Sequence, residues 1–264
     1  MVSQSDYAFR LLTRNHGSTL CYTQMLHARN FCESESFRRD NYDFDPATEG
    51  SRNGAPLVAQ VAGDDPHYMS EAARILERTG VDAIDVNLGC PQNIARKGNY
   101  GAYLLPQTDV VCEVIRAMRG SVSTPITAKV RIQPDLEDTV RICQLLVDAG
   151  ACMLAVHGRT VDETKTSQGS VDLGAIKAVV DSVPVPVIAN GGVEFPSDVS
   201  KVVSQTGAVG VMSSEALLEN PSLFACGRDD GGMSGREIAH RQLELCEEVR
   251  NTFFPRFATQ RPSI

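Results

Sequence analysis

The sequence lacks any apolar stretch that approaches the ~20 residues a membrane-spanning helix needs. Its opening segment, residues 1–10, is polar and lacks the apolar run of a secretory signal peptide. Glycine and proline stand at ordinary levels, 21 and 13 of 264 residues, which excludes fibrous and disordered classes. We therefore expect a globular protein without a membrane segment.

The cysteines lack the spacing of metal sites and of disulfide frameworks. Eight are present, yet none belongs to a CxxC pair or a Cys/His cluster. Several, such as Cys112 and Cys143, lie inside apolar runs, where cysteine acts as a small core residue. The pattern predicts no metal site and a reducing compartment, the cytoplasm or the nucleus.

An excess of positive charge is also missing. The chain has 25 Lys and Arg against 33 Asp and Glu, a formal net charge of -8. Because phosphate binding normally needs a basic surface, this balance weighs against a domain that grips RNA by charge alone. It leaves room for a local basic patch.

Short β-rich runs alternate with helical patterns along the chain. These runs are mostly continuous rather than alternating, which is typical of parallel strands buried on both faces. They are TLCYTQM (19–25), LVAQVA (57–62), AIDVNLG (83–89), ITAKVRI (126–132), MLAVHG (153–158), PVIANGG (186–192) and VGVMSS (209–214). Such repeated units allow a doubly wound sheet or a (β/α)8 barrel. The first of these should open with GxGxxG, which is absent.

Polar residues near the carboxyl ends of the runs favour the barrel. They are Gln60, Asn87, Lys129, His157 and Asn190. In a barrel, these strand ends deliver side chains to the mouth of the active site. The sequence therefore predicts an α/β fold of the TIM (β/α)8 type.

Seven strands are predicted rather than eight. The chain opens with MVSQSD directly before its first helical pattern. We therefore expect a barrel that lacks most of its first strand, reduced to Met1 and Val2. We expect the barrel domain to span residues 1–225. Residues 226–264 would form a linker and one amphipathic helix, the start of a helical C-terminal region.

Several motifs resemble the tRNA-dihydrouridine synthase family. The longest is DVNLGCPQNIARKGNYGAYLL (85–105), and HGRT (157–160), IANGG (188–192) and GVMSSEALLENPSLF (210–224) follow in the family's order. The opening MVSQSDYAFRLL and the segment LCYTQMLHAR match as well. The resemblance covers residues 1–225 and points to the eukaryotic enzymes that act at positions 16 and 17 of the tRNA D-loop.

The resemblance implies an FMN-dependent reduction of uridine to 5,6-dihydrouridine in tRNA, with NADPH or NADH as the electron donor. It implies that Cys90 is the general acid, which protonates C5 of uracil after the reduced flavin delivers a hydride to C6. A thiol suits this role because its ordinary pKa of about 8.5 keeps it protonated at neutral pH yet able to release the proton.

The resemblance also implies substrate contacts. Asn87 offers a donor and an acceptor that match the edge of uracil, although an asparagine there could instead tie down its own loop. Arg96 and Lys97 are candidate contacts to the RNA backbone, as are Arg38 and Arg39. The alternative for these basic residues is a solvated charge pair.

The expected FMN contacts lie at successive strand ends. Lys129 interrupts an apolar strand, where an anion such as reduced flavin would meet its charge. Gln60 would bond the pyrimidine edge of the flavin, and His157 is the other side chain that the family brings to it. Backbone N–H groups after the last two strands would hold the phosphate. The remaining contacts are Met1, Val2, Asn190, Gly191, Gly192, Ser214 and Glu215.

Two other functions are compatible with the sequence. One is a flavoprotein that acts on a free pyrimidine, which the loop from GCPQ to YGA argues against. The other is a catalytically impaired tRNA-binding protein, which would follow from loss of the first strand. We expect a monomer whose partners are tRNA and NAD(P)H.

Overall fold

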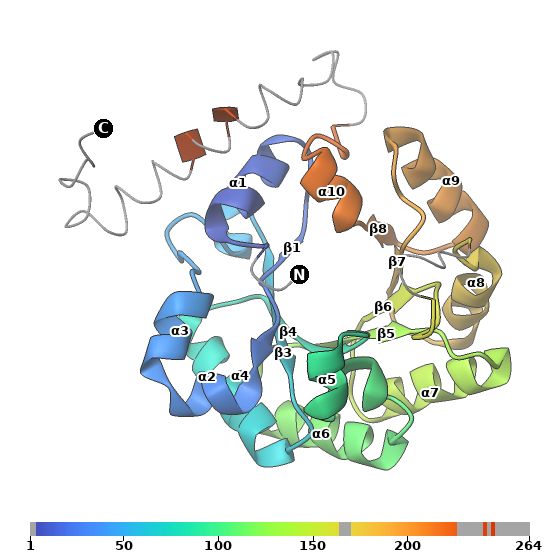
Figure 1. Ribbon diagram of the computed structural model, residues 1–264, viewed down its shortest axis with the longest axis horizontal. Coiled ribbons are helices and arrows are strands. Elements are labelled where there is room, and N and C mark those ends of the chain that lie inside the picture. The colour runs from blue at the N-terminus through green and yellow to red at the C-terminus, as the bar shows by residue number, and fades with distance from the viewer. Residues whose placement is uncertain (1–3, 164–169, 226–239, 242–243, 246–264) are drawn as a thin grey trace.

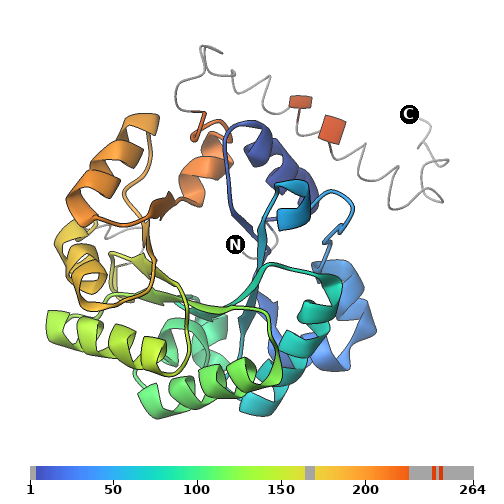
Figure 2. The same ribbon diagram turned by 180° about the vertical axis from the view of Figure 1, so that it is seen from behind.

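The computed structural model describes residues 4–163, 170–225, 240–241 and 244–245. In this part of the chain, parallel strands follow one another around a ring, and helices cover their outer side (Figure 1). Figure 2 shows the same ring from behind. The predicted α/β barrel architecture is confirmed.

Every strand pair in the sheet is parallel, and the order along the sheet is β1-β3-β4-β5-β6-β7-β8. The strands are β1 (Cys21–Tyr22), β2 (Leu26–His27), β3 (Leu57–Ala62), β4 (Ala83–Leu88), β5 (Ile126–Arg131), β6 (Leu154–His157), β7 (Val187–Asn190) and β8 (Gly210–Met212). Because β1 and β2 both pair with β3, they share one strand position. The described residues therefore supply the seven positions that the sequence predicts.

One extra residue lies between β1 and β2. Cys21 pairs with Leu57 and His27 pairs with Ala62, so the first strand is one residue longer than the matching part of β3. Thr23 lies in this bulge, and its hydroxyl oxygen accepts a hydrogen bond from the Gln60 N–H at 3.0 Å. A side chain thus replaces a backbone acceptor where the ladder is interrupted.

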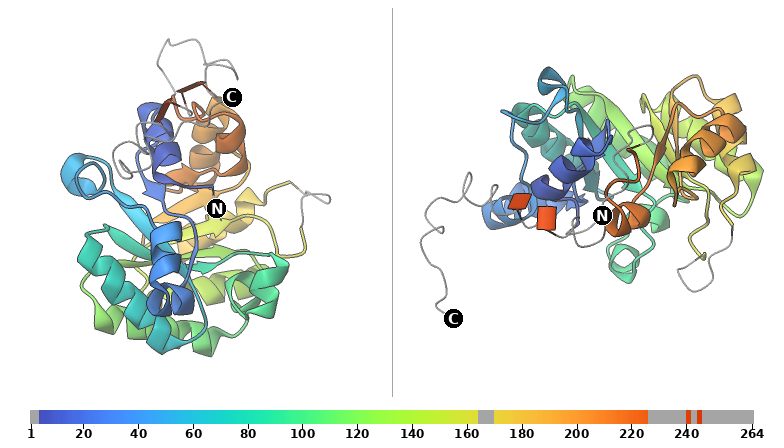
Figure 3. Two further views of the ribbon diagram at one scale, coloured as in Figure 1. Left: turned by 60° about the vertical axis from the view of Figure 1, so that its left-hand side comes forward. Right: turned by 90° about the horizontal axis from the view of Figure 1, so that it is seen from above.

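The helices lie around the outside of the sheet (Figure 3), and they contribute most of their buried apolar residues to the same core cluster as the strands. They are α1 (Tyr7–Asn15), α2 (Ala28–Glu33), α3 (Glu35–Asn41), α4 (Pro66–Thr79), α5 (Asn93–Lys97), α6 (Thr108–Ser121), α7 (Leu136–Asp148), α8 (Leu173–Ser182), α9 (Pro196–Thr206) and α10 (Glu215–Glu219), with 3-10 turns at Ser51–Asn53 and Gly101–Tyr103. Helix α4 illustrates how the sequence sets the bounds. Asp65 accepts a bond from the His67 N–H, Pro66 occupies the first turn, and Gly80 ends the helix in a left-handed conformation.

The two edges of the sheet are β1 and β8, and no strand joins them within the described residues. Met1 and Val2, the predicted remnant of a first strand, lie outside that part of the chain. Helices α1 and α10 lie side by side across the opening (Figures 1 and 2). Gly17, just after α1, packs so closely on the segment after α10 that an added Cβ would lie 2.3 Å from the Phe224 carbonyl oxygen.

A buried ion pair fastens α1 to the rest of the barrel. The Arg10 guanidinium donates to both carboxylate oxygens of Glu49, at 2.8 and 2.6 Å, and the two side chains are almost fully buried. Arg10 also donates to Asp43 at 3.0 Å and to the Ser5 carbonyl at 2.7 Å. The buried Arg10 guanidinium therefore donates to acceptors on Glu49, Asp43 and Ser5, which offset the cost of burying its charge.

No helix in the described part of the chain is both long and apolar enough to cross a membrane. The same residues contain no group of three His, Cys, Asp or Glu that could hold a metal ion. The six described cysteines are free thiols, and Cys112 and Cys143 are buried as small core residues.

Candidate active site

The carboxyl ends of four strands bring the predicted side chains to one rim of the barrel. Parallel pairing aligns Asn87 with Lys129, Arg131 with His157, and His157 with Asn190. Residues that pair in neighbouring parallel strands point to the same face of the sheet. These side chains therefore follow one another around the inner side of the barrel mouth.

A buried amide network lies under this rim. The Gln60 Nε2 donates to Asp85 Oδ2 at 2.9 Å, and the Asn87 Nδ2 donates to Gln60 Oε1 at 2.9 Å. Asp85 is fully buried, and its other oxygen accepts a bond from the Thr127 hydroxyl at 2.7 Å. Burial raises the pKa of Asp85 to about 6, against the lowering effect of Gln60, Thr127 and the Lys129 charge.

Asn87 holds the loop that carries Cys90. Its Oδ1 accepts bonds from the N–H groups of Gly89 at 3.2 Å and of Cys90 at 3.0 Å. The amide therefore has the loop-bracing contacts that were the structural alternative for this residue. One of the two N–H bonds of the Asn87 amide has no partner among the described residues. Contact between this N–H and a uracil base stays a prediction.

The segment after Cys90 folds back over it. The Ala102 N–H donates to the Cys90 carbonyl at 3.1 Å. An added Cβ on Gly101 would lie 2.7 Å from that carbonyl oxygen, so only glycine fits here with its φ of +64°. Tyr100 and Tyr103 pack beside Cys90, and the Tyr103 hydroxyl donates to the Pro91 carbonyl at 2.9 Å. Cys90 remains partly exposed within this tight loop.

Lys129 stands at the rim without a partner. No hydrogen bond or ion pair joins its ammonium to any residue that the structure describes. Burial, followed by the Arg131 charge, lowers the pKa of Lys129 to about 8, while Asp85 and Cys90 act in the opposite direction. A half-buried ammonium in this state favours an anion beside it.

Arg131 is a site residue that the sequence reasoning missed. Its Nε donates to the Gly89 carbonyl at 2.9 Å, and its Nη1 donates to the Thr160 carbonyl at 2.9 Å. It thus links the Cys90 loop to the loop after β6. Burial, followed by the Arg159 charge, lowers the pKa of Arg131. The run KVR at the end of a strand could have revealed Arg131. Residues two positions apart in a strand point to the same face, so Arg131 shares the face of Lys129.

His157 has a buried ring nitrogen, Nε2, without a hydrogen-bond partner in the described structure. Burial, followed by the charges of Lys129, Arg131 and Arg159, lowers the pKa of His157 to about 2. The ring is therefore neutral at physiological pH. Its unsatisfied nitrogen is the kind of group that a ligand completes.

The loops after β7 and β8 approach each other closely. The Asn190 Nδ2 donates to the Met212 carbonyl at 2.9 Å, and the Ser213 hydroxyl donates to the Val193 carbonyl at 3.1 Å. Gly191 and Gly192 have φ values of +96° and +72°. An added Cβ on Gly191 would lie 2.9 Å from His157 Cδ2. The glycines thus let the backbone lie directly against His157.

Two of the remaining predicted cofactor contacts, Ser214 and Glu215, lie beside the opening in the sheet. Ser214 is the residue before α10, and Glu215 is the first residue of that helix. Both follow β8, where the sequence predicts a phosphate. Met1 and Val2 lie outside the described residues.

The basic residues predicted to contact RNA have different environments. Arg96 and Lys97 are exposed at the end of α5, and the Arg96 guanidinium lies 5.9 Å from the centre of the Tyr103 ring. Arg38 instead donates to the Phe31 and Cys32 carbonyls at 2.6 and 2.9 Å. It caps the short helix α2, which gives it a structural role whether or not RNA is bound.

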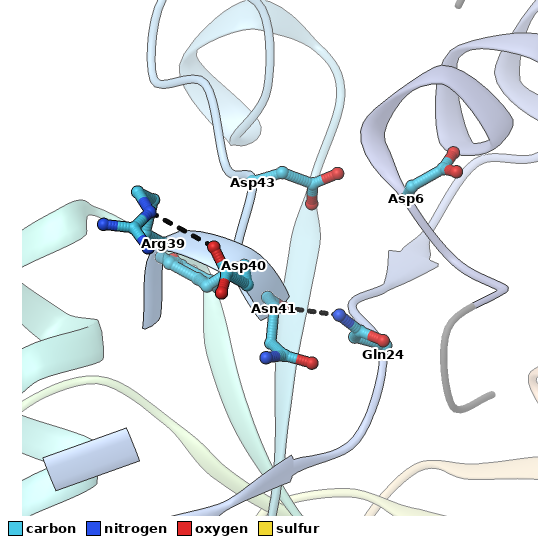
Figure 4. Close-up of a pocket in the computed structure, with 7 residues that line it drawn as sticks. Asp6, Gln24, Arg39, Asp40, Asn41 and Asp43 are labelled. Atoms are coloured by element: carbon cyan, nitrogen blue, oxygen red, sulfur yellow. Dashed lines mark hydrogen bonds and ion pairs between the residues drawn. The ribbon is translucent and has the colours of Figure 1, made fainter. Parts of the chain in front are cut away.

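A hollow of about 230 Å³ lies away from this rim, beside α1 and α3 (Figure 4). Three aspartates face it together with Arg39, which pairs with Asp40 at 3.1 Å. The Gln24 amide closes one side by donating to the Asn41 carbonyl at 2.7 Å. This acidic lining suits neither a phosphate nor RNA, so the hollow is not part of the candidate site.

Comparison with known proteins identifies the family. The family model for dihydrouridine synthase (Dus) matches residues 1–252 and so crosses the domain boundary predicted at residue 225. A Mus musculus relative, named tRNA-dihydrouridine(16/17) synthase NAD(P)(+)-like, is 42% identical over 224 residues, 85% of this chain and 46% of the relative. The Saccharomyces cerevisiae tRNA-dihydrouridine(16/17) synthase NAD(P)(+) is 40% identical over 86% of this chain and 53% of its own length. The chain spans about half the length of these curated relatives.

Solved structures are similar in fold. An Amycolatopsis orientalis BexX/CysO complex contains a chain that matches with a TM-score of 0.52 at 16% identity, over 100% of this chain and 92% of that one. A mandelate oxidase matches with a TM-score of 0.51 at 20% identity, over 92% of this chain and 68% of that one. These likenesses concern the fold alone. The motifs around Cys90 and the family match together show that the chain belongs to the dihydrouridine synthase family.

Proposed function

We propose that this chain carries an FMN-dependent reductase site that converts uridine to 5,6-dihydrouridine in the D-loop of tRNA, at positions 16 and 17, with NADPH or NADH as electron donor. The observation that carries the proposal is the convergence of a thiol, an ammonium and an unsatisfied imidazole at one rim. These groups belong to Cys90, Lys129 and His157. The names of the relatives supply the substrate and the nicotinamide donor.

The residues at the rim fit FMN. The ammonium of Lys129 needs an anion, and the Nε2 of His157 needs a hydrogen-bond partner. The backbone of Gly191 lies directly against that ring, and we infer that the N–H groups of Gly191 and Gly192 meet the phosphate. Gln60 has both of its amide groups engaged within the protein, so we infer that it supports the site and meets the flavin through its remaining N–H.

The chemistry divides between cofactor and protein. When bound, reduced FMN supplies the hydride that C6 of uracil accepts. Cys90 donates the proton to C5, and the Asn87 amide holds the thiol's loop in place through two backbone N–H groups. Lys129 offsets negative charge at the cofactor side. The neutral ring of His157 orients the bound cofactor without adding charge.

The basic residues of the mouth support a polyanionic substrate. Burial is the main cause of the lowered pKa of His157, and the charges of Lys129, Arg131 and Arg159 lower it further, so positive charge gathers here in a chain of net charge -8. Arg96 and Lys97 extend this charge along the exposed side of α5. We infer that the tRNA backbone meets the protein here, where the charge is concentrated.

The partners and place of action follow the sequence expectations. We propose a monomer that meets tRNA and NAD(P)H in the cytoplasm or nucleus, with residues 1–225 as the catalytic domain. Apart from residues 240–241 and 244–245, the predicted linker and helical region, residues 226–264, lies outside the described part of the chain. Size-exclusion chromatography with light scattering tests the monomer. A dimer of about twice the 28.6 kDa chain mass would contradict it.

The decisive experiment incubates the purified chain with FMN, NADPH and unmodified tRNA, followed by nucleoside mass spectrometry and mapping of the reduced position. Dihydrouridine at positions 16 and 17 supports the proposal. Reduction of free uracil but not of tRNA would replace it with a flavoprotein that acts on a free pyrimidine. Binding of tRNA without flavin or product would replace it with a non-catalytic tRNA-binding protein.

A further inference from the structure

A relay of three side chains runs from the interior of the barrel to the backbone of Cys90. It consists of Asp85, Gln60 and Asn87, and each is at most 8% exposed. The Gln60 Nε2 donates to Asp85, the Asn87 Nδ2 donates to Gln60, and the Asn87 Oδ1 accepts from the N–H groups of Gly89 and Cys90. Each of these four hydrogen bonds joins a donor to an acceptor, and one N–H of each amide lies outside the relay.

The loop end of the relay fixes its direction. Backbone N–H groups can only donate, so Asn87 must turn its oxygen toward Gly89 and Cys90 and its NH₂ toward Gln60. Gln60 must then turn its oxygen toward Asn87 and its NH₂ toward position 85. That position therefore has to supply an acceptor. An ionised carboxylate can only accept, so aspartate closes the relay in the one consistent orientation.

The surroundings of Asp85 favour this orienting role over that of a counter-ion. Its two oxygens are held by neutral donors, the Gln60 amide and the Thr127 hydroxyl. The Lys129 charge also acts on Asp85, but only as the last of the causes that affect its pKa, after burial and these two hydrogen bonds. Burial raises the pKa of Asp85 only to about 6, so the carboxylate is still ionised at neutral pH.

We propose that Asp85 is a positioning residue for Cys90, acting through Gln60 and Asn87 to hold the backbone of the Cys90 loop. Its part in catalysis rests on the proposed function, because that function makes Cys90 the proton donor. The relay itself depends on neither flavin nor RNA. A buried amide that loses its acceptor finds no water to replace it, so loss of Asp85 frees both amides to turn and the loop N–H groups to open.

Hydrogen exchange of individual backbone amides, measured by NMR on the ligand-free chain, tests the proposal. In Asp85→Leu, exchange at Gly89 and Cys90 should accelerate about tenfold or more relative to amides of β6, because local opening becomes easier. Asp85→Asn can still turn an oxygen toward Gln60 and should stay within about threefold of the parent. Thr127→Val is the matched control, since it removes the other donor to Asp85 and leaves the relay intact.

Where Asp85→Leu alone does not fold, the double variant Asp85→Leu/Thr127→Val gives the same readout, because it leaves no unpaired hydroxyl beside the leucine and keeps both amides of the relay. Parent-like exchange at Gly89 and Cys90 in a folded leucine variant overturns the proposal. Equal acceleration in Asp85→Asn and Asp85→Leu also overturns it, since charge rather than acceptor geometry would then be responsible. Acceleration in the leucine variants alone supports it.

The two proposals fail separately. The exchange measurement uses neither FMN nor tRNA, so parent-like exchange removes the role of Asp85 and leaves the proposed function standing. If the parent chain forms no dihydrouridine, the proposed function falls while the exchange result stands. With both in place, single-turnover dihydrouridine formation should fall about tenfold in Asp85→Leu and recover in Asp85→Asn, as expected when a positioned acid is misplaced.

Discussion

The strands next to Cys90 and the strands at the opening of the barrel are built differently. β3, β4 and β5 each have six residues, and nearly all of them are buried. β1 and β2 have two residues each, and β8 has three that are all partly exposed. The relay and Lys129 lie on the long strands and Cys90 is in the loop that follows β4, whereas the loop around Ser214 lies beside the opening. The part of the site around Cys90 therefore rests on the more regular half of the sheet.

Different forces hold the two regions. Around Cys90, continuous strand pairing places apolar residues on the outer face and a closed hydrogen-bond network on the inner one. Beside the opening, two other contacts hold the elements together. They are the buried ion pair of Arg10 and Glu49 and the close approach of Gly17 to Phe224. Substitutions in the two regions should accordingly change different properties, stability at the opening and chemistry at the loop.

The largest expected effect is on stability at the opening. Glu49→Leu leaves the Arg10 guanidinium buried without its main partner and should lower the free energy of unfolding by about 3–5 kcal/mol. Urea unfolding followed by circular dichroism measures it. The control is Asp138→Asn, which breaks an exposed pair with Arg141 and should change stability by less than about 1 kcal/mol. A similar small loss in both variants would show that the buried pair does not hold α1.

The next effect is on chemistry at the loop. Cys90→Ala should leave flavin binding and reduction by NADPH nearly unchanged and slow single-turnover dihydrouridine formation by about 10²-fold, the usual scale for losing a positioned acid. Cys90→Ser should recover only part of the rate, since a hydroxyl is a weaker acid than a thiol.

Cys143→Ala is the control for Cys90→Ala, because Cys143 is buried in the core and its loss should reduce stability through a small cavity without affecting the chemistry. Dihydrouridine formation at the parent rate in Cys90→Ala would rule out the thiol as the acid. It would assign proton donation to another group, such as ordered water.

The pH dependence of stability isolates His157. Its pKa is about 2 in the folded chain, so the ring stays neutral while the unfolded chain takes up a proton below about pH 6.5. The contribution of His157 to the free energy of unfolding is therefore fully present above that pH and is lost as the pH falls. Between pH 7 and 5 the parent should lose about 2 kcal/mol more than His157→Gln. Urea unfolding at the two pH values measures this difference.

Asp85 works in the opposite direction over the same range, because its raised pKa of about 6 makes the folded chain take up a proton first. Since Asp85 is present in both proteins, its contribution cancels in the comparison with His157→Gln. Equal acid sensitivity of the two proteins would show that His157 is solvated rather than buried among cations.

The smallest effect sharpens the role of the contact across the opening. Gly17→Ala and Gly54→Ala both place a Cβ on a residue with positive φ, +97° and +68°. Gly54 has open space around its Cα, whereas Gly17 faces the Phe224 carbonyl. Thermal unfolding should show that Gly17→Ala costs about 1 kcal/mol more than Gly54→Ala, because only Gly17 adds a steric clash to the backbone strain. Equal losses would mean that the contact contributes nothing to stability.

The sequence was sufficient to predict the strand order and the rim, because continuous apolar runs and the polar residues that end them can be read locally. Gln60, Lys129 and His157 were found in this way. The partners of these residues could not be predicted in the same way. Asp85 lies in the same run as Asn87, yet its bond to Gln60 depends on the register between β3 and β4.

Two further features depend on contacts between segments that are distant in sequence. Arg131 has a role only because the loops after β4 and β6 lie beside it. Arg38 resembled an RNA contact in the sequence, whereas the short helix α2 ends where its carbonyls need a donor. Local pattern therefore locates the site, and the tertiary fold determines which side chains stay free for a ligand.

The extra residue between β1 and β2 changes the face of the sheet to which the side chains after it point. Side chains of a regular strand alternate between the two faces, so Tyr22 and His27, an odd number of positions apart, would point opposite ways. The bulge puts both on the face shared with Val58 and Ala62, and it lets His27 meet the edge of Tyr100 with 5.5 Å between ring centres. Deleting one residue from this bulge would turn His27 out of the barrel while leaving every residue of the site itself unchanged.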